Sequence, residues 1–335
     1  HICQTRKSGE EFHQHPIQAA IILGRIFPDT STIVATLLHD ITEDTPTTHE
    51  QLVAEFGDEI AGLVDGVTKL GHVRLRNSKD QYYIENLRKM FIATSKDIRV
   101  MLIKLADRLH NMRTIEPLED VKKMKIATET LEMYAPIAGR LGIGAWKDEL
   151  EDLAFKIVSS KDYEKIKHTL DEQLKERDND IKEMEKDLSS ILRREGIKFL
   201  EIAGRSKRIY SLFNKLKKYD DDISKINDII ALRIITKSTA DCYAALGIAH
   251  KHFQPIPNRV KDFIAVPKPN GYQSIHTTVF DKTGHIFELQ IRTDLMHETA
   301  EPGVAAHWFY EERGKSDVVE RQTTWFKELR SWQEE

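Results

Sequence analysis

The sequence predicts a multidomain chain in which an all-α part precedes an α+β part, with helices between them. Apolar residues recur at helical spacing from residue 16 to about 157, as at Ile33, Leu37 and Ile41. After residue 197 the period changes, and short runs rich in Ile, Val and Phe indicate strands. The 335 residues suffice for two domains of roughly 100–200 residues each.

Composition and charge are those of an ordinary globular protein. Hydrophobic residues make up 40%, charged residues 31%, and the formal net charge is -4. These values exclude wholesale disorder and argue against generic nucleic-acid binding. No apolar run approaches the roughly 18 residues of a membrane span, and we expect no signal peptide. Because the chain begins with His1 and not Met, we expect a fragment.

The small number of cysteines bears on the cellular compartment of the protein. Cys3 and Cys242 provide neither a disulfide framework nor a cysteine-based zinc site. We therefore expect a reducing, cytoplasmic location.

A densely charged segment from Asp162 to about Arg194 predicts one long amphipathic helix, roughly 50 Å at 1.5 Å per residue. The simplest interpretation of its charged residues is that they form the solvent-exposed face of this helix. In the α+β part, we expect strands at 229–235, 263–266, 275–280 and 286–291. Helices are expected at 206–219, 240–252 and 296–312.

His39-Asp40 ends an apolar helical stretch, and Glu43-Asp44 follows four residues later. On one continuous helix these four positions fall within an arc of about 140°. That helix face would carry an imidazole and three carboxylates. An all-helical core would bury so many acids only if a cation neutralised them.

Two further segments are candidates for the same site. His15 lies just before a predicted helix, while Asp107 and Asn111 lie one turn apart on another. A site made of His15, His39, Asp40 and Asp107 would offer two imidazoles and two carboxylates, which suits a divalent metal such as Mn²⁺. The alternative is that these are scattered surface polar residues.

This combination resembles the HD phosphohydrolase superfamily, and more narrowly the hydrolase domain of the Rel/RelA/SpoT family of alarmone enzymes. The narrower resemblance rests on RKSGE at 6–10, HP at 15–16, HD-x-x-ED at 39–44, VDGVTKL at 64–70 and KLADRLHNMRT at 104–114. In that family the HD site hydrolyses the 3′-pyrophosphate of ppGpp and pppGpp, leaving GDP or GTP and pyrophosphate.

The resemblance implies a role for each matching residue. His15, His39, Asp40 and Asp107 would be Mn²⁺ ligands. Glu43 and Asp44 would position and deprotonate the attacking water. The nucleotide would be held by Arg6, Lys7, Ser8 and Asn111.

A second constellation follows residue 203. The segment 204–211, GRSKRIYS, is expected to open a basic helix whose first turn could hold a polyphosphate, although a solvated basic face explains it equally well. Asp228 lies at the mouth of an apolar strand. Glu288, Gln290 and Arg292 alternate with apolar residues and share one sheet face. One acid on each of two strands could hold Mg²⁺ against triphosphate oxygens.

These segments, with GYQSIH at 271–276, ELQIRT at 288–293 and GVAAHW at 303–308, resemble the synthetase domain of the same family. That domain transfers a pyrophosphoryl group from ATP to the 3′-hydroxyl of GDP or GTP. The resemblance implies a nucleotidyltransferase-like α+β fold with a mixed sheet. It covers nearly the whole chain, with Ser206 and Phe263 replacing a usual Pro and Tyr.

The implied synthetase roles divide between donor and acceptor. Arg205, Lys207 and Lys215 would bind the ATP phosphates, Asp228 would ligate Mg²⁺, and Glu288 would activate the 3′-hydroxyl or share the metal. Tyr272 would stack on guanine. Lys268, Asn270 and His276 would contact the acceptor nucleotide. Substrate contacts are also expected from Ser211, Arg259, Lys261 and Gln290.

We therefore expect a cytoplasmic, bifunctional enzyme of the stringent response, with a hydrolase domain at 1–140, connecting helices at 141–196 and a synthetase domain at 197–335. Ribosome contact is expected only through a C-terminal region that this sequence lacks, and no membrane or direct nucleic-acid binding is expected. Two alternatives remain open: a hydrolase-dominant enzyme with a weak synthetase, and a silent nucleotide-binding regulatory module.

Overall fold

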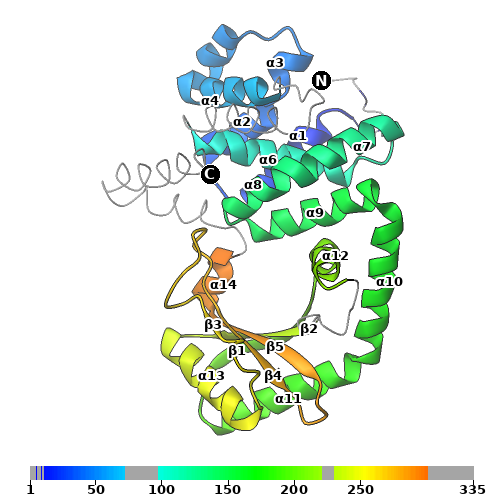
Figure 1. The fold of residues 1–335 in the computed structure, drawn as a ribbon. Helices are drawn as coiled ribbons and strands as arrows, with labels where there is room; N and C mark the ends of the chain where they lie inside the picture. Colours follow the sequence, from blue (N-terminus) through cyan, green and yellow to red (C-terminus); the bar gives the residue numbers. More distant parts are fainter. Residues whose placement is uncertain (1–4, 6–8, 10, 72–96, 221–229, 301–335) are drawn as a thin grey trace, which may run out of the picture. The chain divides into compact units, whose positions relative to one another are not determined.

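A computed structural model describes residues 5, 9, 11–71, 97–220 and 230–300. The chain forms two compact units and passes from the first to the second between Ala138 and Gly139. Each unit is described by itself (Figure 1). Within the described ranges, no helix combines the length and apolar character needed to cross a membrane.

The described part of the first unit is helical, as the sequence predicts, apart from loops and one isolated β-bridge between Thr5 and Glu11. Its helices are α1 (Gln14–Gly24), α2 (Thr30–Leu38), α3 (Ile41–Asp44), α4 (His49–Gly71), α6 (Ile98–Arg113), α7 (Asp120–Glu129), the π-helix η1 (Thr130–Tyr134) and α8 (Ala135–Arg140).

Helix α6 is the centre of this unit, because α1, α2 and α4 all pack against it. Its residues Leu102, Ile103, Leu105 and Leu109 have no exposed surface. A helix that is apolar on most of its circumference is stable only when neighbours surround it. Any polar side chain on its inner turns is therefore also withdrawn from water.

Two glycines shape α4. Gly57 has φ of 83°, which interrupts the helix with a kink and is a backbone conformation that glycine adopts without strain. Gly66, in the segment VDGVTKL, lies against α6, where an added Cβ would lie 2.8 Å from a methyl group of Val100. The motif glycine thus permits close packing of α4 on the central helix.

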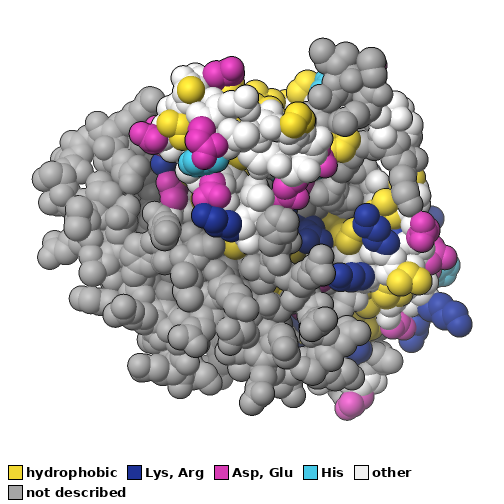
Figure 2. Space-filling model, turned by 90° about the horizontal axis from the view of Figure 1, so that it is seen from above, with side chains coloured by type: hydrophobic (Ala, Val, Ile, Leu, Met, Phe, Trp, Pro, Cys, Tyr) yellow, Lys and Arg dark blue, Asp and Glu magenta, His cyan; other side chains and the backbone are white. Residues whose placement is uncertain are grey.

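The surface of the described residues carries both signs of charge. On the face shown in Figure 2, acidic side chains gather around a histidine, with Lys and Arg side chains beside them.

The second unit combines a five-stranded sheet with helices. Its helices are α9 (Gly144–Val158), α10 (Ser160–Glu176), α11 (Asp178–Arg194), α12 (Ile209–Lys218), α13 (Thr239–His252) and α14 (Asp294–Ala300). Its strands are β1 (Phe199–Ser206), β2 (Ile230–Thr236), β3 (Lys261–Asp262), β4 (Ile275–Phe280) and β5 (Ile286–Thr293).

The strand order is β1-β2-β5-β4-β3. Strands β2 and β5 pair in parallel, whereas the other three pairs are antiparallel. The predicted mixed sheet is thereby confirmed. Helices α11 and α13 pack against the sheet (Figure 1). Leu232, Ile234, Leu289 and Ile291 lie with them in one buried core. Alternation along each strand leaves the intervening side chains on the opposite face.

The expectation of one long helix is wrong, because this segment forms two helices. The chain breaks at Arg177, which has non-helical angles, and α10 and α11 run in clearly different directions (Figure 1). Leu170 packs in the core before the break and Met184 after it. The change of direction lets both helices reach the sheet's core, which one straight rod would not do.

Other expectations about the second unit also need correction. Strand β1 was not expected, and the expected basic helix begins only at Ile209, so Arg205 lies on a strand. Residues 263–266 form no strand. There the Asp262 carboxylate accepts hydrogen bonds from the amides of Ile264 and Ala265, which favours a turn. The final helix begins at Asp294, and residues 301–312 of the expected helix lie outside the described residues.

A pair of glycines on α4 tests the packing argument. Gly66→Ala should lower the free energy of unfolding by about 1 kcal/mol, because overpacking against the stiff Val100 side chain costs about 1–3 kcal/mol and exceeds the helix-propensity gain of about 1 kcal/mol. Gly62→Ala is the matched control, since no atom of the described residues lies within 4 Å of its added Cβ. It should stabilise the protein. Denaturant unfolding of both variants measures the difference, and equal effects would contradict the close contact.

Candidate functional site

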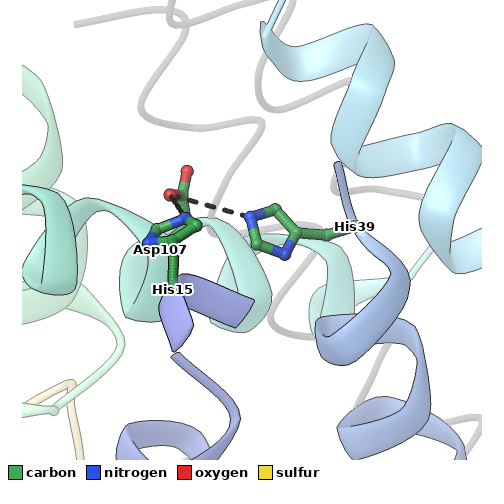
Figure 3. A group of neighbouring side chains, drawn as sticks. All are labelled: His15, His39 and Asp107. Carbon is green, nitrogen blue, oxygen red and sulfur yellow. Dashed lines mark ion pairs between the residues drawn. The ribbon is translucent and has the colours of Figure 1, made fainter. Parts of the chain in front are cut away.

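Three buried side chains from separate helices converge in the first unit. His15 comes from the first turn of α1, His39 follows the last residue of α2, and Asp107 lies on α6. Ligand atoms of the three lie within 4.8 Å of one another, and each residue is at most 4% exposed. Figure 3 shows both imidazoles directed toward the carboxylate. The sequence prediction that these residues meet is confirmed.

Asp40 lies beside this group but is more exposed. Its carboxylate oxygens are 3.2 Å from Nε2 of His39 and 3.6 Å from Nε2 of His15. The expectation of one continuous helix from His39 to Asp44 is wrong, because α2 ends at Leu38 and α3 begins at Ile41. The break turns Asp40 toward the histidines.

Glu43 and Asp44 end the short helix α3, and both are exposed. Their amides donate to the carbonyl of Asp40, which ties this turn to the site. Their predicted role as acceptors of a proton from water stays a prediction.

Buried charge is balanced around Asp107. Nζ of Lys104 lies 2.8 Å from one carboxylate oxygen, and Nε2 of His15 lies 3.1 Å from the other. Burial alone would raise the pKa of Asp107, but the Lys104 ammonium and the nearby imidazoles of His15 and His39 hold that pKa well below its ordinary value. Asp107 therefore keeps its negative charge in a site with almost no access to water.

His39 has a fixed orientation and one uncommitted nitrogen. Its Nδ1 lies 2.7 Å from the carbonyl oxygen of Thr36, which can only accept, so Nδ1 carries the proton. Burial alone would lower the pKa of His39, but Asp107 and Asp40 raise it. Within the described part of the chain, Nε2 is buried and has no hydrogen-bond partner of acceptable geometry. A buried lone pair of this kind fits a metal ligand.

Asn111 lies one turn after Asp107, as predicted, and its amide donates to the Asp107 carboxylate. Its expected contact with a nucleotide stays a prediction. Arg6, Lys7 and Ser8 lie outside the described residues, so their placement is not tested.

The second unit carries a polar face on its sheet. Register pairs Arg233 with Gln290, and Gln290 with His276 on the other side. Residues paired directly across strands point to the same face. The face opposite the α11–α13 core therefore carries Arg205, Arg233, Lys261, His276, Glu288 and Gln290. Asp228 lies outside the described residues.

A hydrogen-bonded chain crosses this face. The hydroxyl of Tyr272 lies 2.8 Å from Nε2 of His276, and Nδ1 of His276 lies 2.7 Å from Oε1 of Glu288. Nζ of Lys268 lies 5.0 Å from the centre of the Tyr272 ring. Burial, with the nearby Lys261, lowers the pKa of Lys268. Tyr272, His276, Glu288 and Lys268 thus form one connected group, and their predicted roles stay predictions.

One predicted phosphate-binding residue, Arg205, and the neighbouring Arg208 interact with the protein itself. Nη2 of Arg205 lies 3.5 Å from the Asp148 carboxylate of α9, and Nη1 lies 3.4 Å from Oε1 of Gln290. Arg208 lies 3.8 Å from the same Asp148. Carboxylates of α9 therefore lie where the sequence places phosphate binding.

The remaining predicted residues are more dispersed. Lys207 precedes α12, while Ser211 and Lys215 lie on it. Arg259 and Lys261 are exposed. The Asn270 amide donates to the carbonyl of Gly139, and its oxygen accepts from the amide of Tyr272, so in this structure Asn270 orders the loop.

Three neighbours of these sites were not predicted. Lys104 and His110 were part of the matched string, but only three-dimensional packing reveals their contacts with Asp107 and His15. Arg233 could have been found as a cation at an alternating position within an apolar strand.

Comparison with known families gives two matches. An HD domain matches residues 1–144, and a region found in RelA/SpoT proteins matches residues 204–315. The chain belongs to the RelA/SpoT family. An HD domain with the observed triad also suits a divalent metal ion.

Curated relatives of this family match nearly the whole chain. A probable guanosine-3′,5′-bis(diphosphate) 3′-pyrophosphohydrolase from Synechocystis is 45% identical over 99% of this chain and 44% of its own length. A GTP pyrophosphokinase from Myxococcus xanthus is 46% identical over 100% and 44%. The bifunctional (p)ppGpp synthase/hydrolase SpoT from Escherichia coli is 43% identical over 98% and 47%. The chain thus spans less than half the length of these relatives.

Among solved structures, the small alarmone synthetase 1 from Bacillus subtilis, bound to its product pppGpp, matches with a TM-score of 0.34. That match has 22% identity and covers 50% of this chain and 94% of that one. Family membership rests on the sequence matches.

The buried ion pair of the first unit makes a testable prediction. Asp107→Asn should lower the free energy of unfolding by about 3–5 kcal/mol, because it leaves the Lys104 ammonium buried without its counter-ion. Adding Lys104→Met should recover most of that stability while leaving the metal site without the Asp107 carboxylate. Chemical denaturation of the single and double variants checks this. A single variant as stable as the parent would contradict the charge balance described above.

Proposed function

We propose that this chain is a bifunctional enzyme of cytoplasmic alarmone metabolism. One site hydrolyses the 3′-pyrophosphate of ppGpp or pppGpp, and the other transfers a pyrophosphoryl group from ATP to the 3′-hydroxyl of GDP or GTP. The observation that carries the proposal is the buried group of His15, His39 and Asp107 in a chain of the RelA/SpoT family. The polar sheet face supports the second activity.

For hydrolysis, His15, His39, Asp40 and Asp107 would hold Mn²⁺, a choice that two imidazoles and two carboxylates favour over Mg²⁺. When bound, the metal supplies positive charge that stabilises developing negative charge on phosphate oxygens. Glu43 and Asp44 are exposed at the edge of the group and would accept the proton of the attacking water. Arg6, Lys7, Ser8 and Asn111 would hold the nucleotide.

For synthesis, Glu288 would accept the proton of the 3′-hydroxyl. Its hydrogen bond from His276, itself bonded to Tyr272, fixes the direction of the carboxylate. Arg205, Lys207, Ser211 and Lys215 would bind the ATP phosphates. Tyr272, Lys268, Asn270, Gln290, Arg259 and Lys261 would bind the acceptor. Asp228 would hold Mg²⁺, which supplies charge neutralisation for the triphosphate.

Two parallel incubations test the proposal. The protein is supplied with ATP and GDP in Mg²⁺, and separately with ppGpp in Mn²⁺, while both nucleotide pools are followed. Formation of ppGpp and AMP in the first, and of GDP and pyrophosphate in the second, would support both activities. Hydrolysis without synthesis would identify a hydrolase-dominant enzyme, and neither reaction would leave a silent binding module.

Glu288→Gln separates the two activities. The substitution is nearly isosteric but removes the proton acceptor, so pyrophosphoryl transfer should fall at least a hundredfold while ppGpp hydrolysis stays within twofold. Asp187→Asn is the control, because that carboxylate forms an exposed ion pair with Lys282 in the same unit. Steady-state rates of both reactions measure the effect. Transfer retained within tenfold would show that Glu288 is structural.

Asp148→Asn should improve ATP binding. The Asp148 carboxylate competes with phosphate for Arg205 and Arg208. Removing the negative charge of Asp148 makes both guanidinium groups available to the ATP phosphates. Because both arginines are over 40% exposed, each pair contributes about 0.2–1 kcal/mol, so the KM for ATP should fall by about fivefold at most for each pair released. The KM for GDP should not change. An unchanged or higher KM for ATP would place the phosphates elsewhere.

A further inference from the structure

The two histidines of the buried triad are oriented in different ways. His39 donates from Nδ1 to a backbone carbonyl, which no side-chain substitution removes. His15 instead has its Nδ1 only 2.7 Å from Nδ1 of His110, a residue to which the proposed mechanism gives no role. One histidine of the site thus depends on a side chain for its orientation.

The proton between His15 and His110 can have only one useful position for a metal ligand. At 2.7 Å, one of the two Nδ1 atoms must donate and the other accept. Nε2 of His15 faces Asp107 and Asp40, at 3.1 and 3.6 Å. If this nitrogen is to bind a cation, it must present a lone pair, which puts the His15 proton on Nδ1. His110 must then accept through its own Nδ1.

We infer that His110 is the positioning residue of the metal site, accepting a hydrogen bond from Nδ1 of His15 and thereby directing the Nε2 lone pair of His15 at the cation. This inference rests on the proposed hydrolase site, and it assigns a role to a residue that contacts one of the metal ligands.

Burial and helix geometry support this role. His110 is 6% exposed and lies on α6, three residues after Asp107, so both project from neighbouring positions of one helix. The rings of His15 and His110 have centroids 4.8 Å apart and are tilted by 49°, an arrangement that allows an in-plane hydrogen bond in place of stacking. One rigid helix thus provides both a metal ligand and the orienting partner of a second ligand.

The test is metal affinity, measured without substrate. Titration calorimetry of the metal-stripped protein with Mn²⁺ gives the Kd of the parent, His110→Phe and His110→Gln. Phenylalanine keeps a ring of similar size but cannot accept, whereas the glutamine oxygen can accept from Nδ1 of His15. We expect Kd to rise 10- to 100-fold for His110→Phe and to return within threefold of the parent for His110→Gln.

Controls separate positioning from general damage. His250→Phe removes a half-buried histidine that bonds to Thr277 in the other unit, and it should leave Kd unchanged. Thermal unfolding in chelator should be similar for the two His110 variants. If His110→Phe does not fold, His110→Met replaces it, because methionine matches glutamine in length and is a far weaker acceptor.

Two results overturn the inference: an unchanged Kd in the variant without an acceptor, or an equal loss of affinity in His110→Gln. Failure of the proposed function looks different. In that case the parent binds Mn²⁺ and the variants follow the expected order, but ppGpp is not hydrolysed.

Discussion

A carboxylate withdrawn from water on the central helix is the constraint around which the first unit is organised. Asp107 lies on α6 between residues that have no exposed surface, so its charge must be met by other protein groups. Lys104 and the imidazoles of His15 and His39 surround it. Each comes from a helix that packs on α6 or from α6 itself. The same contacts that bury the helix therefore assemble the site.

The second unit meets a related constraint with a sheet. One face is apolar and packs on α11 and α13, which leaves the alternate positions for polar side chains. Because β2, β5 and β4 are adjacent, Arg233, Gln290 and His276 lie side by side. Hydrogen bonding from Tyr272 through His276 to Glu288 then connects a loop to this face. The conformation of the loop that carries Tyr272 and the orientation of the Glu288 carboxylate are thus linked.

The site residues could be predicted from the sequence where several of them occur together in one short string. His15-Pro16, His39-Asp40 and LADRLHN together identified the triad, because each string places its polar residue on or beside an otherwise apolar helix. The same reasoning missed β1, whose FLEIAGRS lacks clean alternation and includes a glycine. It also missed the break at Arg177, because apolar spacing alone reads the same on one helix or two. His110 lies within a matched string, but the sequence predicts no role for it because its contact with His15 joins residues 95 positions apart.

The strand order has a consequence for how the second unit is made. The last strand in the chain, β5, lies between β2 and β4. During synthesis, β2 has only β1 as a partner, and β4 has only β3, until residues 286–293 have been made. One edge of β2 and one edge of β4 therefore stay unpaired until β5 has been synthesised. This delay slows formation of the sheet and leaves both edges open to pairing with other strands. Because β5 also carries Glu288 and Gln290, the sheet closes and its polar face is completed in the same event.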